Sequence, residues 1–228
     1  MSPAALPALM PETEAIACLA RFGIACPDCK LALSAGEAAQ MAEGLGYPVV
    51  LKIVSSEIVH KSDVGGVEVG LQSRDEVAAG YDRIMDAVRR GSPGAAVDSV
   101  LVCKQAAPGV EVIVGGLIDP MFGRALMFGM GGIFAEVLKD VTFRVIPITA
   151  ADAMEMIGEV RGYPLLAGAR NRPACDREAL ADLLVRVSRL MEASPEIEEL
   201  DLNPVRVYTH GVLVLDVKMM RARAGAPA

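Results

Sequence analysis

Short apolar segments rich in β-branched residues alternate along this chain with longer segments of helical periodicity, and this alternation limits the chain to a mixed α and β fold. Strands are expected at residues 47–54, 67–71, 99–104, 110–117, 124–130, 141–148, 198–208 and 212–219. Helices are expected at residues 12–22, 34–46, 73–90 and 177–192, with a short one after Thr149. Three of these helices begin with capping-box spacing, in the pairs Ser34–Glu37, Ser73–Glu76 and Thr149–Asp152.

The order of these segments predicts two α+β lobes around a cleft. A turn-rich segment at residues 91–94 separates the two halves. We therefore expect one lobe at residues 11–98 and a second at residues 99–220. The proline-rich ends, residues 1–10 and 221–228, are expected to be disordered tails.

Charge and hydropathy exclude several classes of function. With 228 residues the chain can bury a substantial core, and its net charge of −7 argues against a nucleic-acid partner. The longest uncharged runs have 11 residues, at 1–11 and 125–135. A membrane-spanning helix needs roughly 20 apolar residues, so no membrane span is expected. No basic residue precedes Arg21, and a cytoplasmic location is expected.

Five cysteines are present, an odd number that argues against a disulfide scaffold. Cys26 and Cys29 have the spacing of a redox or zinc motif. Zinc would need two further ligands, and the chain offers two histidines and no second cysteine pair of this spacing. The pair is therefore interpreted as incidental.

Lys52 lies within the apolar strand segment PVVLKIV. A lysine among apolar neighbours is costly unless its ammonium reaches water or an anion. Two interpretations remain open: the side chain extends to solvent from a strand edge, or it binds a nucleotide phosphate.

The following loop, SSEIVHKSDVGGV, contains His60 beside Lys61 and ends in two glycines. A histidine in this setting can accept a phosphoryl group or act as an acid or base, and the glycines can let backbone amides approach phosphate oxygens. The alternative is an ordinary polar surface loop.

Asp201 and Asn203 are two residues apart on an expected strand, so their side chains share a face. A hairpin turn at His210-Gly211 returns the chain and brings Asp216 near Asn203. A carboxylate and a carboxamide oxygen suit Mg²⁺ that bridges nucleotide phosphates. The alternative is a solvated polar sheet face.

Residues 129–132, Gly-Met-Gly-Gly, lack the spacing of a dinucleotide fingerprint. They indicate either a tight connection between strands or a close backbone approach by a ligand.

Taken together, YPVVLKIVSSEIVHKSDVGGV, GVEVIVGGLIDPMFGRALMFGMGGIFAEVLKDVTFRVIPIT and LDLNPVRV with LDVK resemble a known family over about residues 12–220. The family is that of the β subunits of ADP-forming acetyl-CoA and acyl-CoA synthetases, an ATP-grasp domain related to the succinyl-CoA synthetase β chain. The resemblance implies an α+β ATP-grasp fold with the nucleotide, ATP or ADP, in the cleft between two lobes.

The resemblance also implies roles for individual residues. Lys52 would contact the nucleotide phosphates, and Asn203 with Asp216 would hold Mg²⁺. His60 would carry the phosphoryl group, and Asp201 would orient or stabilise the phosphohistidine. Glu111 would meet the ribose. The adenine hinge, acting mainly through its backbone, would comprise Val102, Cys103, Lys104, Gln105 and Ala106.

The implied reaction is acyl-CoA + ADP + phosphate ⇌ carboxylate + CoA + ATP, through an acyl phosphate and a phosphohistidine. The resemblance implies that a separate α subunit handles CoA, the carboxylic acid and the principal phosphohistidine. No CoA-binding Rossmann fingerprint occurs in this chain. The expected assembly is a hetero-oligomer. The alternatives are a regulatory module that binds ATP without turnover and a stand-alone carboxylate ligase, for which no suitable arginine cluster is evident.

Overall fold

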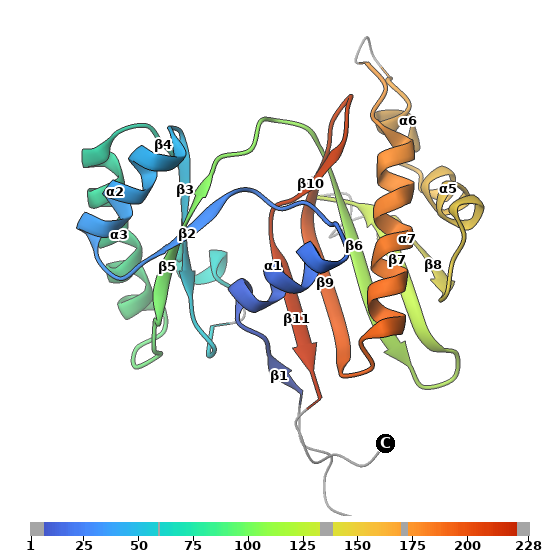
Figure 1. Ribbon diagram of the computed structural model, residues 1–228, viewed down its shortest axis with the longest axis horizontal. Coiled ribbons are helices and arrows are strands. Elements are labelled where there is room, and N and C mark those ends of the chain that lie inside the picture. Colours follow the sequence, from blue (N-terminus) through green and yellow to red (C-terminus); the bar gives the residue numbers. More distant parts are fainter. Residues whose placement is uncertain (1–6, 59, 133–138, 170–172, 223–228) are drawn as a thin grey trace, which may run out of the picture. The chain divides into compact units, whose positions relative to one another are not determined.

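The computed structural model describes residues 7–58, 60–132, 139–169 and 173–222, and Figure 1 traces the chain. The chain divides into two compact units. One comprises Met1–Cys26 with Pro108–Ala228, and the other is the continuous segment Pro27–Ala107. Each unit has its own hydrophobic core and its own sheet.

The continuous unit is built on a four-stranded antiparallel sheet in the order β2-β5-β3-β4. Its strands are β2 (Cys29–Ala32), β3 (Val49–Val54), β4 (Val67–Leu71) and β5 (Ser99–Lys104). Its helices are α2 (Ala35–Leu45), α3 (Arg74–Gly91) and the 3-10 turn η1 (Ser62–Val64). Apolar residues of α2 and α3 pack against the β3 side chains Val49, Leu51 and Ile53, which are fully buried.

The two expected capping boxes of this unit form with a shift of one residue. Ser34 Oγ accepts a hydrogen bond from Glu37 N, as predicted, and Ser73 Oγ accepts one from Glu76 N. The glutamate carboxylates, however, accept from Leu33 N and Gln72 N, the residues that precede the caps. Each helix start therefore still satisfies two backbone donors, but not the same pair as in a standard capping box.

The second unit is built on a seven-stranded antiparallel sheet in the order β1-β11-β9-β6-β7-β8, with β10 also paired to β9. The strands are β1 (Ala8–Leu9), β6 (Val110–Asp119), β7 (Gly123–Met130), β8 (Val141–Val145), β9 (Ile197–Val207), β10 (Val212–Val214) and β11 (Val217–Arg221). The helices are α1 (Glu12–Arg21), α5 (Ala150–Glu159), α6 (Tyr163–Leu166) and α7 (Arg177–Ala193).

One face of this sheet forms the larger core. Leu180, Leu184 and Val187 of α7 and Met156 of α5 are fully buried, as are Leu126 and Phe128 of β7, and they belong to one cluster. Along β9 the alternating residues Leu200 and Leu202 belong to the same cluster, so Asp201 and Asn203 between them lie on the opposite face. The sheet therefore has a face packed on α1, α5 and α7 and a face with polar residues.

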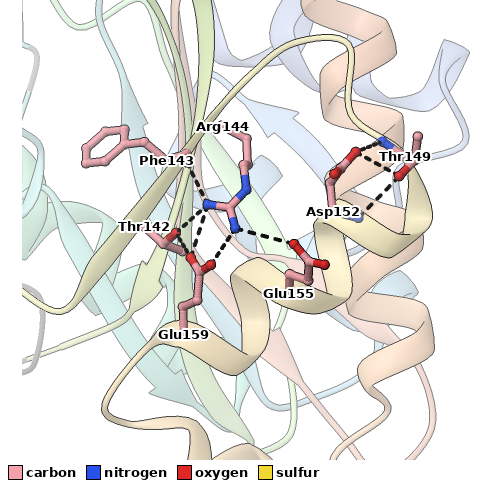
Figure 2. A network of polar contacts seen from close by, with 7 residues as sticks. All are labelled: Thr142, Phe143, Arg144, Thr149, Asp152, Glu155 and Glu159. Carbon is pink, nitrogen blue, oxygen red and sulfur yellow. Dashed lines mark hydrogen bonds and ion pairs between the residues drawn. The ribbon is translucent and has the colours of Figure 1, made fainter.

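A polar network attaches α5 to the edge strand β8 (Figure 2). Arg144 pairs with Glu159 and, at 3.8 Å, with Glu155, while Thr142 donates a hydrogen bond to Glu159. These bonds lower the pKa of the Glu159 carboxyl, mainly through Arg144. Phe143 points away from α5 (Figure 2), as the alternation of a strand requires.

The two-unit division differs from the boundary expected after residue 98. β5 pairs with both β2 and β3, so it completes the four-stranded sheet instead of starting the next lobe. The helix α1 and strand β1 precede the continuous unit in sequence but belong to the other unit, where β1 pairs with β11. The expected tails are shorter than predicted, since β1 begins at Ala8 and β11 extends to Arg221; residues 1–6 and 223–228 lie outside the described residues.

Cys29 and Cys103 are joined by a disulfide, contrary to the expectation from the odd cysteine count. The two residues lie directly opposite each other on β2 and β5. The next pair, Asp28 and Lys104, is hydrogen-bonded, so Cys29 and Cys103 form a non-hydrogen-bonded pair whose side chains approach closely. Cys26 is free, which agrees with the interpretation of the Cys26–Cys29 spacing as incidental.

We expect thiol titration of the unfolded protein without reductant to detect three cysteines, Cys18, Cys26 and Cys175. After reduction, five should react. The disulfide closes a loop of 74 residues, so its loss through Cys29→Ser should lower the free energy of unfolding by roughly 2–4 kcal/mol and lower the Tm. Cys26→Ser is the matched control and should leave the Tm unchanged, whereas five reactive thiols before reduction would contradict the pairing.

Candidate functional site

Lys52 lies on β3, an inner strand of the four-stranded sheet between β5 and β4. Its neighbours Leu51 and Ile53 point into the core against α2 and α3, so the Lys52 side chain lies on the opposite face. Directly opposite it on β5 is Leu101. Because β3 is not an edge strand, the interpretation that Lys52 extends to solvent from a strand edge is not supported.

His60 is exposed in the loop that joins β3 to β4, immediately before Lys61 and the turn η1. The loop closes back on β3 because Ile53 N donates to Gly66 O and Gly66 N donates to Lys61 O. A Cβ at Gly66 would lie 2.6 Å from the Ile53 side chain, so this position requires glycine for packing. The packing of Gly66 against Ile53 therefore explains why glycine occupies this position, without a need for phosphate binding by its backbone amide.

The expected hinge residues have side chains that are engaged within their own unit. Cys103 forms the disulfide, and Lys104 Nζ donates to the carbonyl oxygens of Gly46 and Tyr47 beyond the end of α2. Gln105 Oε1 accepts from Gly70 N at 2.7 Å, and Gln105 N donates to Pro48 O. Ala106 follows directly. Side chains committed in this way are compatible with a hinge that binds its ligand through the backbone.

The predicted hairpin brings Asn203 and Asp216 opposite each other. β10 and β11 pair with β9 in one register, with Val214 opposite Val205 and Val217 opposite Leu202. Asn203 N donates to Asp216 O at 3.2 Å. The single strand expected at 212–219 is instead interrupted at residues 215–216, where the facing Pro204 has no amide hydrogen to donate.

Asp201 lies on the same face as Asn203, with Lys218 opposite it on β11 and Gly115 on β6. Asn203 is exposed, and Asp201 and Asp216 are half-buried. The structure thus brings together, within one unit, three of the polar side chains expected from the sequence. Two carboxylates and one carboxamide offer oxygen ligands of the kind that Mg²⁺ binds.

Asp176 holds the turn of this hairpin. It caps α7 by accepting from Ala179 N at 2.9 Å, and its other carboxylate oxygen accepts from Gly211 N at 2.8 Å. These two bonds, that from Gly211 first, lower the pKa of the Asp176 carboxyl. Gly211 has a φ of +81°, which glycine adopts without strain. The hairpin that carries Asn203 and Asp216 is therefore anchored to a long helix.

Glu111 on β6 pairs with Arg206 on β9, a residue that the sequence analysis did not single out. The two residues are opposite each other in the ladder, and Arg206 Nε and Nη2 both donate to Glu111 Oε1, at 3.1 and 3.0 Å. The only signal in the sequence was a charged residue between two valines, three positions after Asn203.

Glycines 129 and 131 allow close packing between neighbouring strands. A Cβ on Gly129 would lie 2.8 Å from Asp140 O, and one on Gly131 would lie 2.9 Å from the carbonyl of Glu111. Gly131 N also donates to Glu111 O at 2.8 Å. Of the two interpretations left open for these glycines, the structure supports the tight connection.

Among the described residues, no group of three or more histidine, cysteine, aspartate or glutamate side chains is placed to hold a metal ion. No described helix is long and apolar enough to cross a bilayer.

Comparison with known proteins identifies the family. Residues 5–220 match the ATP-grasp domain family. The chain belongs to the ATP-grasp family. This ATP-grasp protein is 46% identical to the β subunit of acetate–CoA ligase [ADP-forming] I from Pyrococcus furiosus, over 92% of this chain and 90% of that subunit. It therefore belongs, within the ATP-grasp family, with the β subunits of the ADP-forming acetate–CoA ligases.

Solved structures agree with this assignment. Acetyl-coenzyme A synthetase 1 of Candidatus Korarchaeum cryptofilum, in complex with coenzyme A and Ca-AMPCP, superposes on this ATP-grasp protein with a TM-score of 0.92 and 45% identity, over 94% of this chain and 93% of that one. The same enzyme with coenzyme A and Mg-AMPPCP gives 0.81 and 42%, over 93% and 92%. The resemblance and the fold class expected from the sequence are confirmed.

Proposed function

We propose that this chain is the nucleotide-binding β subunit of an ADP-forming acyl-CoA ligase, which interconverts acyl-CoA, ADP and phosphate with carboxylate, CoA and ATP. The observation that carries the proposal is the pairing of Asn203 with Asp216 across β9 and the β10–β11 segment, with Asp201 on the same face. The kinship with a Pyrococcus furiosus β subunit of this class supports it.

Nucleotide binding would use the residues expected from the sequence. Lys52 would contact the phosphates as a point charge, and Glu111 would accept a hydrogen bond from the ribose. Backbone groups at Cys103, Gln105 and Ala106 would bind the adenine, since their side chains are small or committed elsewhere. Asn203 and Asp216 fit Mg²⁺ as oxygen donors, and Mg²⁺ there would neutralise charge on the phosphates.

His60 would receive the phosphoryl group. A ring nitrogen of His60 attacks the terminal phosphorus of ATP, the bond from that phosphorus to the bridging oxygen breaks, and ADP leaves. Asp201 would orient or stabilise the imidazole that carries the phosphate, as carboxylates commonly do for histidines. In the direction of ATP synthesis the same steps run in reverse.

A partner subunit would supply the remaining substrates. The Pyrococcus furiosus relative is named as a subunit, which supports a partner for this chain. We propose that the partner is an α subunit that binds CoA and the carboxylic acid, and that the active protein is therefore a hetero-oligomer. We also propose that this hetero-oligomer is cytoplasmic.

Calorimetric titration of ATP with Mg²⁺ into the chain tests the proposed site. Lys52→Ala should weaken binding by about 10- to 100-fold, because a charge-assisted contact to phosphate is lost. Lys30→Ala is the matched control, since Lys30 is exposed on β2, an edge strand of the same sheet, and it should bind as the wild type does. Equal affinities for the two variants, or no binding by the wild type, would contradict the proposal.

A further inference from the structure

The ion pair between Glu111 and Arg206 has a geometry that bears on nucleotide recognition. Two donors of Arg206, Nε and Nη2, converge on one carboxylate oxygen, Oε1. Among the residues that the structure describes, no hydrogen-bond donor reaches the other oxygen, Oε2. The Glu111 side chain keeps 38% of its surface exposed, and that of Arg206 keeps 24%. The pair therefore holds the carboxylate in place and leaves one of its oxygens accessible.

The backbone of Glu111 is fixed as well. It is paired with Arg206 in the ladder between β6 and β9, and its carbonyl oxygen accepts from Gly131 N at 2.8 Å. With the main chain fixed, the remaining freedom of Glu111 is rotation of its side chain, and fixing that rotation on ligand binding costs rotamer entropy. Arg206 removes that freedom before a ligand arrives.

Arg206 lies on the same sheet face as the metal-ligand candidates. Its neighbours Val205 and Val207 belong to the larger core, so the Arg206 side chain lies on the opposite face, as those of Asp201 and Asn203 do. Glu111 on β6 and Leu213 on β10 lie opposite Arg206.

We infer that Arg206 is a positioning residue for ribose recognition: it orients Glu111 so that the free carboxylate oxygen accepts a hydrogen bond from a ribose hydroxyl of the nucleotide. This inference rests on the proposed function, because it assigns the nucleotide to this face. It makes Arg206 a determinant of the choice between ribonucleotides and deoxyribonucleotides.

The test compares affinities for ATP, 2′-deoxyATP and 3′-deoxyATP, measured by calorimetry with Mg²⁺ in the full-length chain. The wild type should bind one of the deoxy analogues about tenfold more weakly than ATP, the value of one hydrogen bond to a charged acceptor. Arg206→Met should weaken ATP binding and bring the ratio of the ATP affinity to the affinity for that deoxy analogue close to one. Arg206→Lys keeps the charge but not the paired donors, and it should give an intermediate ratio.

Two further variants separate positioning from general destabilisation. In a Glu111→Ala background, Arg206→Met should have no further effect on the ratio, since the two residues act as one unit. Arg144→Met removes another Arg–Glu pair of the same sheet, on the face packed against α5 (Figure 2), and should leave the ratio at its wild-type value.

The outcomes distinguish the inference from the function on which it rests. If Arg206→Met weakens ATP and both deoxy analogues equally and keeps the wild-type ratio, Arg206 contacts another part of the nucleotide or supports only the fold, and the inference is wrong. Wild-type binding with no discrimination against either analogue also overturns it, while leaving the nucleotide site intact. Failure of the wild type to bind ATP overturns the proposed function together with the inference.

Discussion

His60→Ala is expected to abolish phosphorylation of this chain and to lower acyl-CoA ligase activity on the order of 10³-fold or more, because the proposed acceptor of the phosphoryl group is removed. His60 is exposed and precedes the η1 turn, so its loss should leave the fold and the Tm unchanged. The measurement is incorporation of label from ATP labelled at the γ-phosphate, with Mg²⁺, into tagged chain purified from its own cells with its bound subunits. The subunits are separated by denaturing electrophoresis before the label on this chain is counted. A phosphohistidine is identified by its lability in acid and stability in base.

The chain provides its own control for this experiment. It has two histidines, and His210 lies in the turn between β9 and β10, so His210→Ala should retain the label. A regulatory module that binds ATP without turnover predicts a different result, with no label in the wild type and unchanged partner activity after His60→Ala. Label that persists in His60→Ala and disappears in His210→Ala would show that the wrong histidine was chosen.

Local signals in the sequence were sufficient for most helices and strands. The apolar periodicity of α7 and its Asp176 cap predicted Arg177–Ala193 to within one residue, and the segment 99–104 became β5 with the expected bounds. Both predictions depend on side chains close in sequence, where periodicity and capping act. The opposition of Asn203 and Asp216 was also predictable, because a tight hairpin fixes the register of its two strands.

Features that depend on contacts between distant segments were not predictable in this way. The unit boundary was misplaced because β5 pairs with β2 and β3, and no local pattern records which sheet a buried strand joins. The Cys29–Cys103 disulfide spans 74 residues, and the cysteine count carries no information on strand pairing. Arg206 was missed for the same reason, since its partner Glu111 lies 95 positions earlier.

Asp216→Asn should remove the response of nucleotide binding to Mg²⁺. The substitution keeps an oxygen donor opposite Asn203 but removes the negative charge, and Mg²⁺ binds carboxylates far better than neutral amides. We expect the gain in ATP affinity that Mg²⁺ gives the wild type to disappear, and phosphoryl transfer to fall by about 10³-fold, which corresponds to about 4 kcal/mol of transition-state stabilisation. Calorimetric titrations with Mg²⁺ and with a chelator measure the first effect, and label incorporation into His60 measures the second.

Asp182→Asn is the matched control, because it makes the same change of charge on the exposed surface of α7, where Asp182 pairs with Arg186. An effect of overall charge on an anionic nucleotide would appear equally in both variants, whereas loss of a metal ligand would appear in Asp216→Asn alone. Partial recovery of ATP affinity at high Mg²⁺ or Mn²⁺ concentration would identify the defect as weak metal binding and not as a distorted hairpin, since a distorted hairpin would not respond to metal. If Asp216→Asn keeps the full Mg²⁺ response, the ligand lies elsewhere, and the assignment of Asn203 and Asp216 to the metal is wrong.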